Sequence, residues 1–326
     1  MPAKKPRVSI VIRAFNEEKH LGGLLNSIQE QTIRDVEIIL VDSGSTDRTL
    51  AIAARYPVTV LHIKPGEFTF GRSLNLGLRA AQGELAVLAS AHVLPLSRDW
   101  LKQLLAPFED PKVAISYGAQ RGVAGSRFSE AQHFLRWFPE QSNLDQANAY
   151  CNNANLALRL SLWRKQPFDE TLTGLEDLAW ASAWREHGYK IAYVAEAGVA
   201  HYHLETAAQI LNRHRREAIA LRCILPSSRF NPWHFVSLFL RSVASDFGAS
   251  WRQRVFFRQA GGIIAFRFLQ YLGTYLGYHD PLDPSAELKK IFYYPPGSLE
   301  DRSQKANAKP IKEASRSQPR HDGQPS

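Results

Sequence analysis

The sequence has 326 residues, of which 44% are hydrophobic and 22% are charged. This length and composition are typical of a soluble globular protein with a sizeable core, as one large α/β domain with an appendage or as two modest domains. The two cysteines, Cys151 and Cys223, exclude a disulfide framework and a cysteine-type metal site, and they favour a reducing compartment.

The formal net charge of +9 is concentrated in the C-terminal part of the chain. Lys and Arg number 22 against 21 acidic residues in residues 1–204, but 18 against 10 in residues 205–326. This excess predicts either a phosphate-rich partner, such as nucleic acid or an anionic membrane, or a solubilising surface. The sequence shows neither the apolar core of a signal peptide after Arg7 nor a membrane-spanning run, so we expect a cytoplasmic protein.

Strands and helices alternate in the first part of the chain. Apolar runs predict strands at 8–12, 36–41, 58–63, 85–89 and 113–117. Amphipathic segments between them predict helices at 17–30, around Leu50 and Ile52, and at 70–81 and 99–108. This alternation predicts right-handed βαβ units and a mostly parallel sheet.

The later segments change in character twice. Residues 120–150 predict a long ordered loop with a helix, followed by extended chain at 155–159, a helix at 178–187 and a strand at 191–194. From Thr206 the pattern is helical and aromatic, and the final segment is polar. We therefore expect a catalytic domain over 7–205, a helical aromatic and basic region over 206–296, and a disordered tail over 297–326.

Polar residues follow three of the predicted strands. Asn16 follows the first strand, Asp42 the second, and Ser90 and His92 the strand at 85–89. Ligands bind at the C-terminal ends of parallel strands, so these residues predict one site, although each residue alone also suits a turn or a helix cap. Neither G-x-G-x-x-G after the first strand nor G-x-x-x-x-G-K-[ST] is present, which argues against a dinucleotide-binding dehydrogenase or a P-loop enzyme.

The motifs at these strand ends resemble those of family 2 glycosyltransferases. The resemblance begins with Val8–Glu18 and Val41–Asp47 and ends near His201–His203. Between these points it runs through residues 71–77, 81–84, 90–92 and 176–180, and residues 163–177 are similar to bacterial rhamnosyltransferase-like members. It implies an A-type glycosyltransferase fold: α/β, a three-layer, mostly parallel nucleotide-sugar-binding sheet, here with a C-terminal helical extension.

The resemblance also implies roles for individual residues. Asp177 corresponds to the general base that takes the proton of the acceptor hydroxyl, and Glu176 helps to position it or the acceptor. Family members invert the anomeric carbon in a single displacement, here in the synthesis of a cell-surface polysaccharide or glycolipid. The expected donor-binding residues are Ala14, Phe15, Asn16, Asp42, Arg72, Ser90 and Ala91.

The chain departs from the family where an Asp-x-Asp motif normally holds a divalent ion. These positions read Ser90-Ala91-His92. An imidazole is a metal ligand that suits Mn²⁺ better than Mg²⁺, so we expect His92 to bind the ion together with His201 or, preferably, His203. Metal-free catalysis, with Arg72 and other cations stabilising the diphosphate, is the alternative.

Further candidates are less specific. Asn152, Asn153 and Asn155 are candidates for binding sugar hydroxyls, and Arg121 and Arg127 for binding anions. Basic and aromatic residues alternate after Arg213, which suits a peripheral contact with the inner face of the plasma membrane, single-stranded nucleic acid, or packing onto the catalytic domain. We expect the partners to be a nucleotide-sugar donor and a glycan or lipid-linked acceptor, and we expect no nucleic acid. Two hypotheses compete with sugar transfer: a catalytically inactive sugar-nucleotide module and a nucleic-acid-binding protein.

Overall fold

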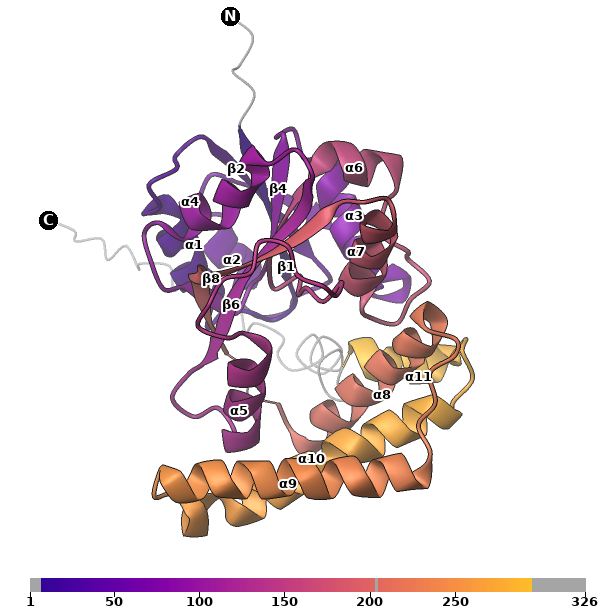
Figure 1. Cartoon of the computed structure of the whole chain (residues 1–326). Coiled ribbons are helices and arrows are strands. Elements are labelled where there is room, and N and C mark those ends of the chain that lie inside the picture. Colours follow the sequence, from indigo (N-terminus) through magenta and orange to yellow (C-terminus); the bar gives the residue numbers. More distant parts are fainter. Residues whose placement is uncertain (1–6, 203–204, 295–326) are drawn as a thin grey trace, which may run out of the picture.

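The strands of the protein form one eight-stranded sheet in a computed structural model that describes residues 7–202 and 205–294. Across the sheet the order is β3-β2-β1-β4-β7-β6-β8-β5 (Figure 1). The strands are β1 Val8–Ala14, β2 Val36–Asp42, β3 Val58–His62, β4 Leu85–Ser90, β5 Val93–Pro95, β6 Val113–Gly122, β7 Asn155–Arg159 and β8 Lys190–His201.

The sheet is parallel in its first half and mixed in its second. The four strands β3, β2, β1 and β4 are mutually parallel, as predicted from the strand–helix alternation. Strand β7 runs antiparallel to both β4 and β6, whereas β6 and β8 are parallel. The chain reaches β7 through the long connection after β6 rather than through a single crossover helix, so it enters the sheet from the opposite end.

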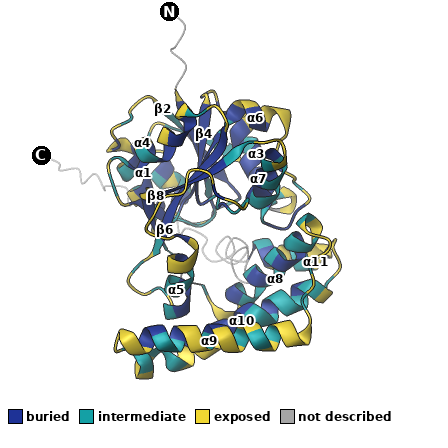
Figure 2. Ribbon diagram, in the orientation of Figure 1, coloured by how far each residue is buried: buried dark blue, intermediate teal, exposed yellow. Residues whose placement is uncertain are grey.

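Helices cover both faces of the sheet and confirm the three-layer expectation. One apolar cluster joins α1 (Leu21–Gln29) and α4 (Trp100–Leu105) to the β-strand residues of one face, such as Ile10 and Ile12. The second joins α3 (Phe70–Ala80), α6 (Leu160–Lys165) and α7 (Glu176–Glu186) to the other face, where Val11 lies. Alternate residues of β1 therefore pack into different clusters, and Figure 2 shows the strands buried between the helices.

The remaining helices form a separate layer below the sheet in Figure 1. They are α5 Phe128–Trp137, α8 Ala207–Ile224, α9 Pro232–Arg252, α10 Phe256–His279 and α11 Ala286–Tyr293; α2 (Thr49–Ala53) belongs to the sheet half. Gly273 and Gly277 let α10 lie directly on α8, because a Cβ atom at these positions would come within 2.4 Å and 2.2 Å of the α8 carbonyl oxygens of Leu211 and Arg215. The predicted tail at 297–326 lies outside the described residues.

A buried ion pair joins three helices of this layer to one another. Arg267 of α10 donates from Nε to Asp246 of α9 at 2.8 Å, and it also donates to the carbonyl oxygen of Ser129 in α5. Both charged side chains are almost completely buried. Among the described residues, no helix has the length and apolar character needed to cross a membrane.

Candidate functional site

A cavity of about 860 Å³ lies between the C-terminal edge of the sheet and the helical layer. The ends of β1 and β4 contribute Arg13 and Ser90, and His92 follows directly. Glu176 and Asp177, at the start of α7, face the same cavity. Helix α8 closes the opposite side.

The carboxylates of Glu176 and Asp177 are held by a small hydrogen-bond network. The backbone N–H of Asn153 donates to Asp177 Oδ2 at 2.7 Å, and the Asn153 side-chain amide donates to Glu176 Oε1 at 2.8 Å. Arg13 donates to Asn153 Oδ1 at 2.9 Å and lies 3.7 Å from Glu176. Leu175, just before α7, adopts a left-handed conformation with φ of 57°, a strained geometry that often occurs at functional sites.

Asp177 has the electrostatic environment of a base that works near neutral pH. Burial, reinforced by the adjacent charge of Glu176, raises the pKa of Asp177 to about 7. The hydrogen bonds from the backbone N–H groups of Asn153 and Leu178, and the charge of Arg13, act in the opposite direction. A carboxylate with this pKa is about half ionised at pH 7, and its ionised form accepts a proton readily.

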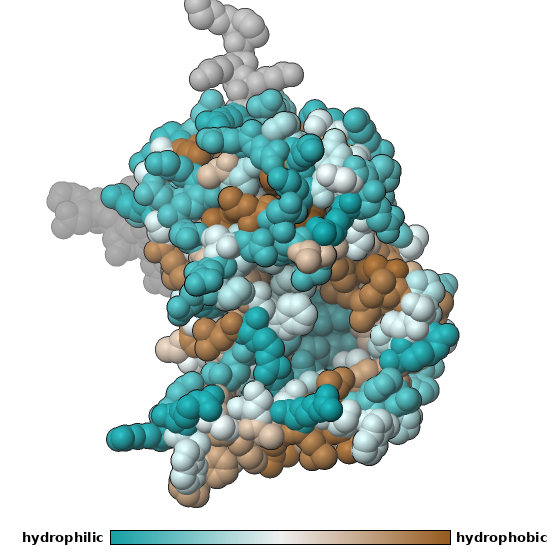
Figure 3. Space-filling view, in the orientation of Figure 1, coloured by the Kyte–Doolittle hydropathy of each residue, from teal (hydrophilic) through white to brown (hydrophobic). Residues whose placement is uncertain are grey.

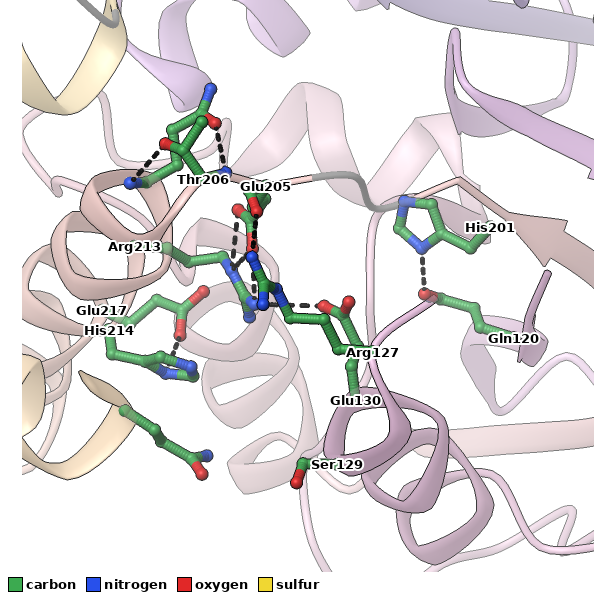
Figure 4. Close-up of polar contacts among 12 residues, drawn as sticks. Gln120, Arg127, Ser129, Glu130, His201, Glu205, Thr206, Arg213, His214 and Glu217 are labelled. Carbon is green, nitrogen blue, oxygen red and sulfur yellow. Dashed lines mark hydrogen bonds and ion pairs between the residues drawn. The ribbon is translucent and has the colours of Figure 1, made fainter. Parts of the chain in front are cut away.

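His92 lies across the cavity in contact with acidic and imidazole side chains. Its Nδ1 is 2.6 Å from Glu17 Oε1, and its ring stacks on His201 with centroids 5.0 Å apart. His201 Nδ1 is in turn 2.6 Å from Gln120 Oε1 (Figure 4). The contact with Glu17 fixes the orientation of the His92 ring, as acidic partners do for imidazoles that bind metal ions.

The predicted metal site is only partly represented in the described chain. The second ligand favoured by the sequence, His203, lies outside the described residues. Within the two described ranges, no group of three His, Cys, Asp or Glu side chains comes together in a way that could hold a metal ion. The described residues thus supply His92 and its orienting partner Glu17, but not a full ligand set.

Asp42, predicted to contact the nucleoside, does not line the cavity. It is 2% exposed, and its carboxylate accepts the N–H groups of Gly44 at 3.0 Å and Ser45 at 3.1 Å. Tyr294, which follows α11, covers the adjacent position: its hydroxyl is 3.4 Å from the carbonyl oxygen of Ser43, and its ring centroid is 5.1 Å from that of Phe15. The described C-terminal helices thus reach back to the ends of β1 and β2.

The other predicted donor residues divide into two groups. Asn16 and Ser90 line the cavity; Asn16 has φ of 55° and accepts the N–H of Thr46 at 2.7 Å, so it also shapes the neighbouring loop. Ala14 and Ala91 are buried in or beside the strands and are not among the cavity-lining residues. Arg72 is exposed, 3.5 Å from Glu67, and likewise does not line the cavity.

Two asparagines predicted to bind sugar hydroxyls have different roles in the structure. Asn153 orients the two carboxylates, as described above. Asn155 is completely buried: its Oδ1 accepts from Trp100 Nε1 at 2.9 Å, and its amide donates to the carbonyl oxygen of Ala197 at 2.8 Å. Its role is therefore to join strands and α4, and the hydroxyl-binding expectation for Asn155 is wrong.

The arginines of α8 are inside the protein rather than on a basic surface patch. Arg213 donates to Glu205 at 2.7 Å and to Glu130 at 3.2 Å across the cavity wall (Figure 4). Arg215 forms a two-bond ion pair with Asp280. The sequence shows only the overall charge of this segment. Two of the acidic partners, Glu130 and Asp280, are distant along the chain and could not be assigned from it.

Comparisons with known proteins agree with this architecture. The family model of glycosyl transferase family 2 matches residues 9–171. The O-antigen chain rhamnosyltransferase WbaN of Salmonella anatum is 29% identical over 240 residues, covering 70% of this chain and 74% of the relative. The O-antigen chain rhamnosyltransferase RfbN of Salmonella typhimurium is 24% identical over 239 residues, with the same two coverages.

Two solved structures share the fold. The mannosyltransferase PcManGT from Pyrobaculum calidifontis, solved with GDP-Man and Mn²⁺, has a TM-score of 0.57 and 20% identity, covering 89% of this chain and 88% of its own. Glucosyl-3-phosphoglycerate synthase from Mycobacterium tuberculosis, solved with Mn²⁺, UDP and glucosyl-3-phosphoglycerate, has a TM-score of 0.52 and 20% identity, covering 70% and 82%. The predicted A-type glycosyltransferase fold is confirmed.

Proposed function

The chain belongs to glycosyl transferase family 2, and we propose on this basis that its cavity transfers a sugar from a nucleotide-diphosphate donor to an acceptor hydroxyl with inversion at the anomeric carbon. The observation that carries the proposal is the buried pair Glu176 and Asp177, held by Asn153 and facing the cavity. The similarity to two O-antigen chain rhamnosyltransferases supports rhamnose as the sugar and a surface polysaccharide or glycolipid as the product.

In the proposed reaction, one bond forms and one breaks at the anomeric carbon, and each residue has a defined role. The acceptor oxygen forms a bond to the anomeric carbon while its proton passes to the Asp177 carboxylate. The bond from the anomeric carbon to the donor's phosphate oxygen breaks, and the nucleoside diphosphate leaves with the electron pair. Glu176 and Asn153 keep Asp177 in place, and Asn16 and Ser90 contribute to the donor side of the cavity.

We further propose that a divalent ion, Mn²⁺ rather than Mg²⁺, binds at His92 with His203. Such an ion would neutralise charge on the diphosphate. The fixed orientation of the His92 ring by Glu17 supports this assignment. Five further residues remain proposed contacts of the donor, although they do not line the cavity in this structure: Ala14, Phe15, Asp42, Arg72 and Ala91. For them to touch the donor, the side chains at the ends of β1 and β2 would have to move.

The experiment is a panel of nucleotide-activated sugars, including activated rhamnose, tested by thermal stabilisation and by donor hydrolysis with and without Mn²⁺. Asp177→Asn is the matched control for the chemical step. We expect a donor that both stabilises the protein and is turned over by the wild type. Stabilisation without turnover in any condition would support an inactive sugar-nucleotide module instead.

We also propose a peripheral contact with an anionic membrane through the outer face of α9 and α10. Figure 3 shows hydrophobic residues along the lower edge of the molecule, over these helices. Trp233 is 74% exposed, Trp251 is 65% exposed and Phe257 is 90% exposed. Trp251 and Phe257 lie 6.4 Å apart between ring centroids, so the apolar stripes of the two helices adjoin.

The charge of this face supports a lipid surface as its partner. Residues 225–279 contain six arginines and one acidic residue, Asp246, which is buried in its pair with Arg267. Exposed aromatic side chains with arginines are typical of proteins that bind anionic membrane interfaces. A second copy of the chain would place like charges opposite each other.

Vesicle flotation tests this contact. We expect binding to vesicles containing phosphatidylglycerol, weaker binding to phosphatidylcholine alone, and loss of binding in a Trp233→Ala, Trp251→Ala, Phe257→Ala variant. Leu96→Ala with Leu144→Ala, which removes exposed apolar side chains from the sheet half, is the control. Equal flotation of all proteins, or salt-sensitive binding of oligonucleotides but not of vesicles, would contradict the membrane contact.

A further inference from the structure

Two arginines from opposite sides of the cavity meet at one aromatic ring. Arg13 comes from the end of β1 and Arg216 from α8, and both line the cavity. Their guanidinium carbons lie 5.0 Å and 4.0 Å from the centroid of the Phe70 ring. Cations at this distance from an aromatic ring are attracted to it, so Phe70 keeps both guanidinium groups at the cavity wall.

Arg216 lacks the partners that a buried cation normally has. Its Nε is buried without a hydrogen-bond partner, and the ion pairs found among the described residues do not include it. Its neighbours in α8 differ in this respect, since Arg213 and Arg215 are both paired with carboxylates. A buried, incompletely bonded cation costs free energy unless a ligand completes its bonds.

The electrostatics around the two arginines indicate an anionic ligand. Burial lowers the pKa of Arg13 and of Arg216, and the charge of Arg216 contributes to the lowering at Arg13. Carboxylates act in the opposite direction, Glu176 and Asp177 on the pKa of Arg13, and Glu217, Glu176 and Glu205 on the pKa of Arg216, but the pKa of each arginine remains lowered. An anion between the guanidinium groups would relieve this repulsion.

The position of Arg13 relates this anion site to the reaction. Arg13 pairs in register with Ser90 across β1 and β4, and its carbonyl oxygen accepts the N–H of Ala91 at 3.3 Å. It also lies 3.7 Å from Glu176, next to the proposed base. The anion site therefore adjoins both the strand end that carries the Ser90–His92 motif and the carboxylate pair.

We propose that Arg216, together with Arg13, binds the diphosphate of the donor and stabilises it as the leaving group. This inference rests on the proposed sugar transfer. As the bond between the anomeric carbon and the phosphate oxygen breaks, the diphosphate gains one negative charge, and fixed guanidinium groups favour that charged state. Bidentate guanidinium–phosphate contacts are suited to this role, and Arg216 has donors available for it.

Calorimetric titration of nucleoside diphosphates and the matching monophosphates tests the assignment. For Arg216→Gln we expect a loss of about ten- to hundredfold in affinity for the diphosphate and a much smaller loss for the monophosphate, because the lost contacts are charge-assisted hydrogen bonds to phosphate. Arg216→Lys retains the charge and is expected to restore part of the affinity. Arg55→Gln, an exposed site outside the cavity, is the charge-matched control.

The readouts separate a phosphate contact from a structural role. Equal losses for monophosphate and diphosphate, or unchanged affinity with a lowered melting temperature, would overturn the assignment. A loss confined to farnesyl diphosphate, used as a probe for a lipid-linked acceptor, would overturn the donor as the source of the phosphate. If wild-type protein bound no nucleoside diphosphate, the sugar-transfer proposal itself would fail, whereas binding that survives Arg216→Gln removes only this inference.

Discussion

Transfer activity should depend on pH through the ionisation of Asp177. The rise in its pKa from an ordinary value of 3.8 to about 7 corresponds to about 4 kcal/mol in favour of the protonated form. Only the carboxylate can accept the acceptor's proton, so activity should increase with pH and level off above neutrality. At pH 6, one unit below the pKa, about a tenth of the molecules would carry the active form.

Glu176→Gln provides the perturbation that tests this reasoning. The charge of Glu176 is, after burial, the main cause that raises the pKa of Asp177. Removing this charge while keeping a side chain that can accept from Asn153 should move the midpoint of the pH–rate profile to lower pH. The assay is single-turnover transfer between pH 5 and 9, and Asp177→Asn should reduce turnover by about 10²–10⁴ at the plateau with donor binding preserved.

The same pKa predicts a stability change of known sign. An aspartate whose pKa is raised by folding binds more protons in the native state than in the unfolded state between pH 4 and 7, so stability decreases as pH increases through that range. Asp177→Asn should weaken this decrease, measured as the melting temperature at several pH values. A pH–rate profile that is flat from pH 6 to 8, or a midpoint that Glu176→Gln leaves in place, would refute the assignment of Asp177 as the base.

Three further predictions concern other parts of the structure. His92→Ala should abolish the response of activity to Mn²⁺, measured by metal titration; an unchanged response would remove His92 from the metal site. Tyr294→Ala should tighten nucleoside diphosphate binding several-fold, because the ring covers the position beside Phe15 and Ser43, and weaker binding would contradict this view. Arg267→Ala should lower the free energy of unfolding by about 3–5 kcal/mol in chemical denaturation, because it leaves Asp246 buried without its partner; a change under 1 kcal/mol would be inconsistent with the pair.

The sequence predicted the parts of the fold that depend on local patterns. The strands predicted at 8–12, 36–41 and 85–89 are present, and the helix predicted at 178–187 is present as α7, which begins two residues earlier, at Glu176. Strand β7 was recognised as extended chain, but its antiparallel direction was not, because strand direction depends on how a distant connection enters the sheet. Strand β5 was not predicted at all, because its three residues form a strand only by pairing with β8, which lies far along the chain.

Site residues that belong to a sequence motif could be predicted. Residues whose role depends on tertiary contacts could not. Glu176, Asp177 and His92 were identified from motif resemblance and do line one cavity. Asn155 has the same side chain as Asn153, and only the three-dimensional structure distinguishes a strand-joining residue from one that orients the carboxylates. Tyr294 is 251 residues from Ser43, so no local signal could relate the two.

The return of α11 to the end of β1 has a consequence for protein engineering. Tyr294 and Phe15 touch, although they come from opposite ends of the described chain. A chimera that takes its helical section from another protein would therefore also import a side chain that packs against the end of β1. The helices and the end of β1 cannot be exchanged as independent modules unless the last residues of α11 and Tyr294 are redesigned together with the first strand.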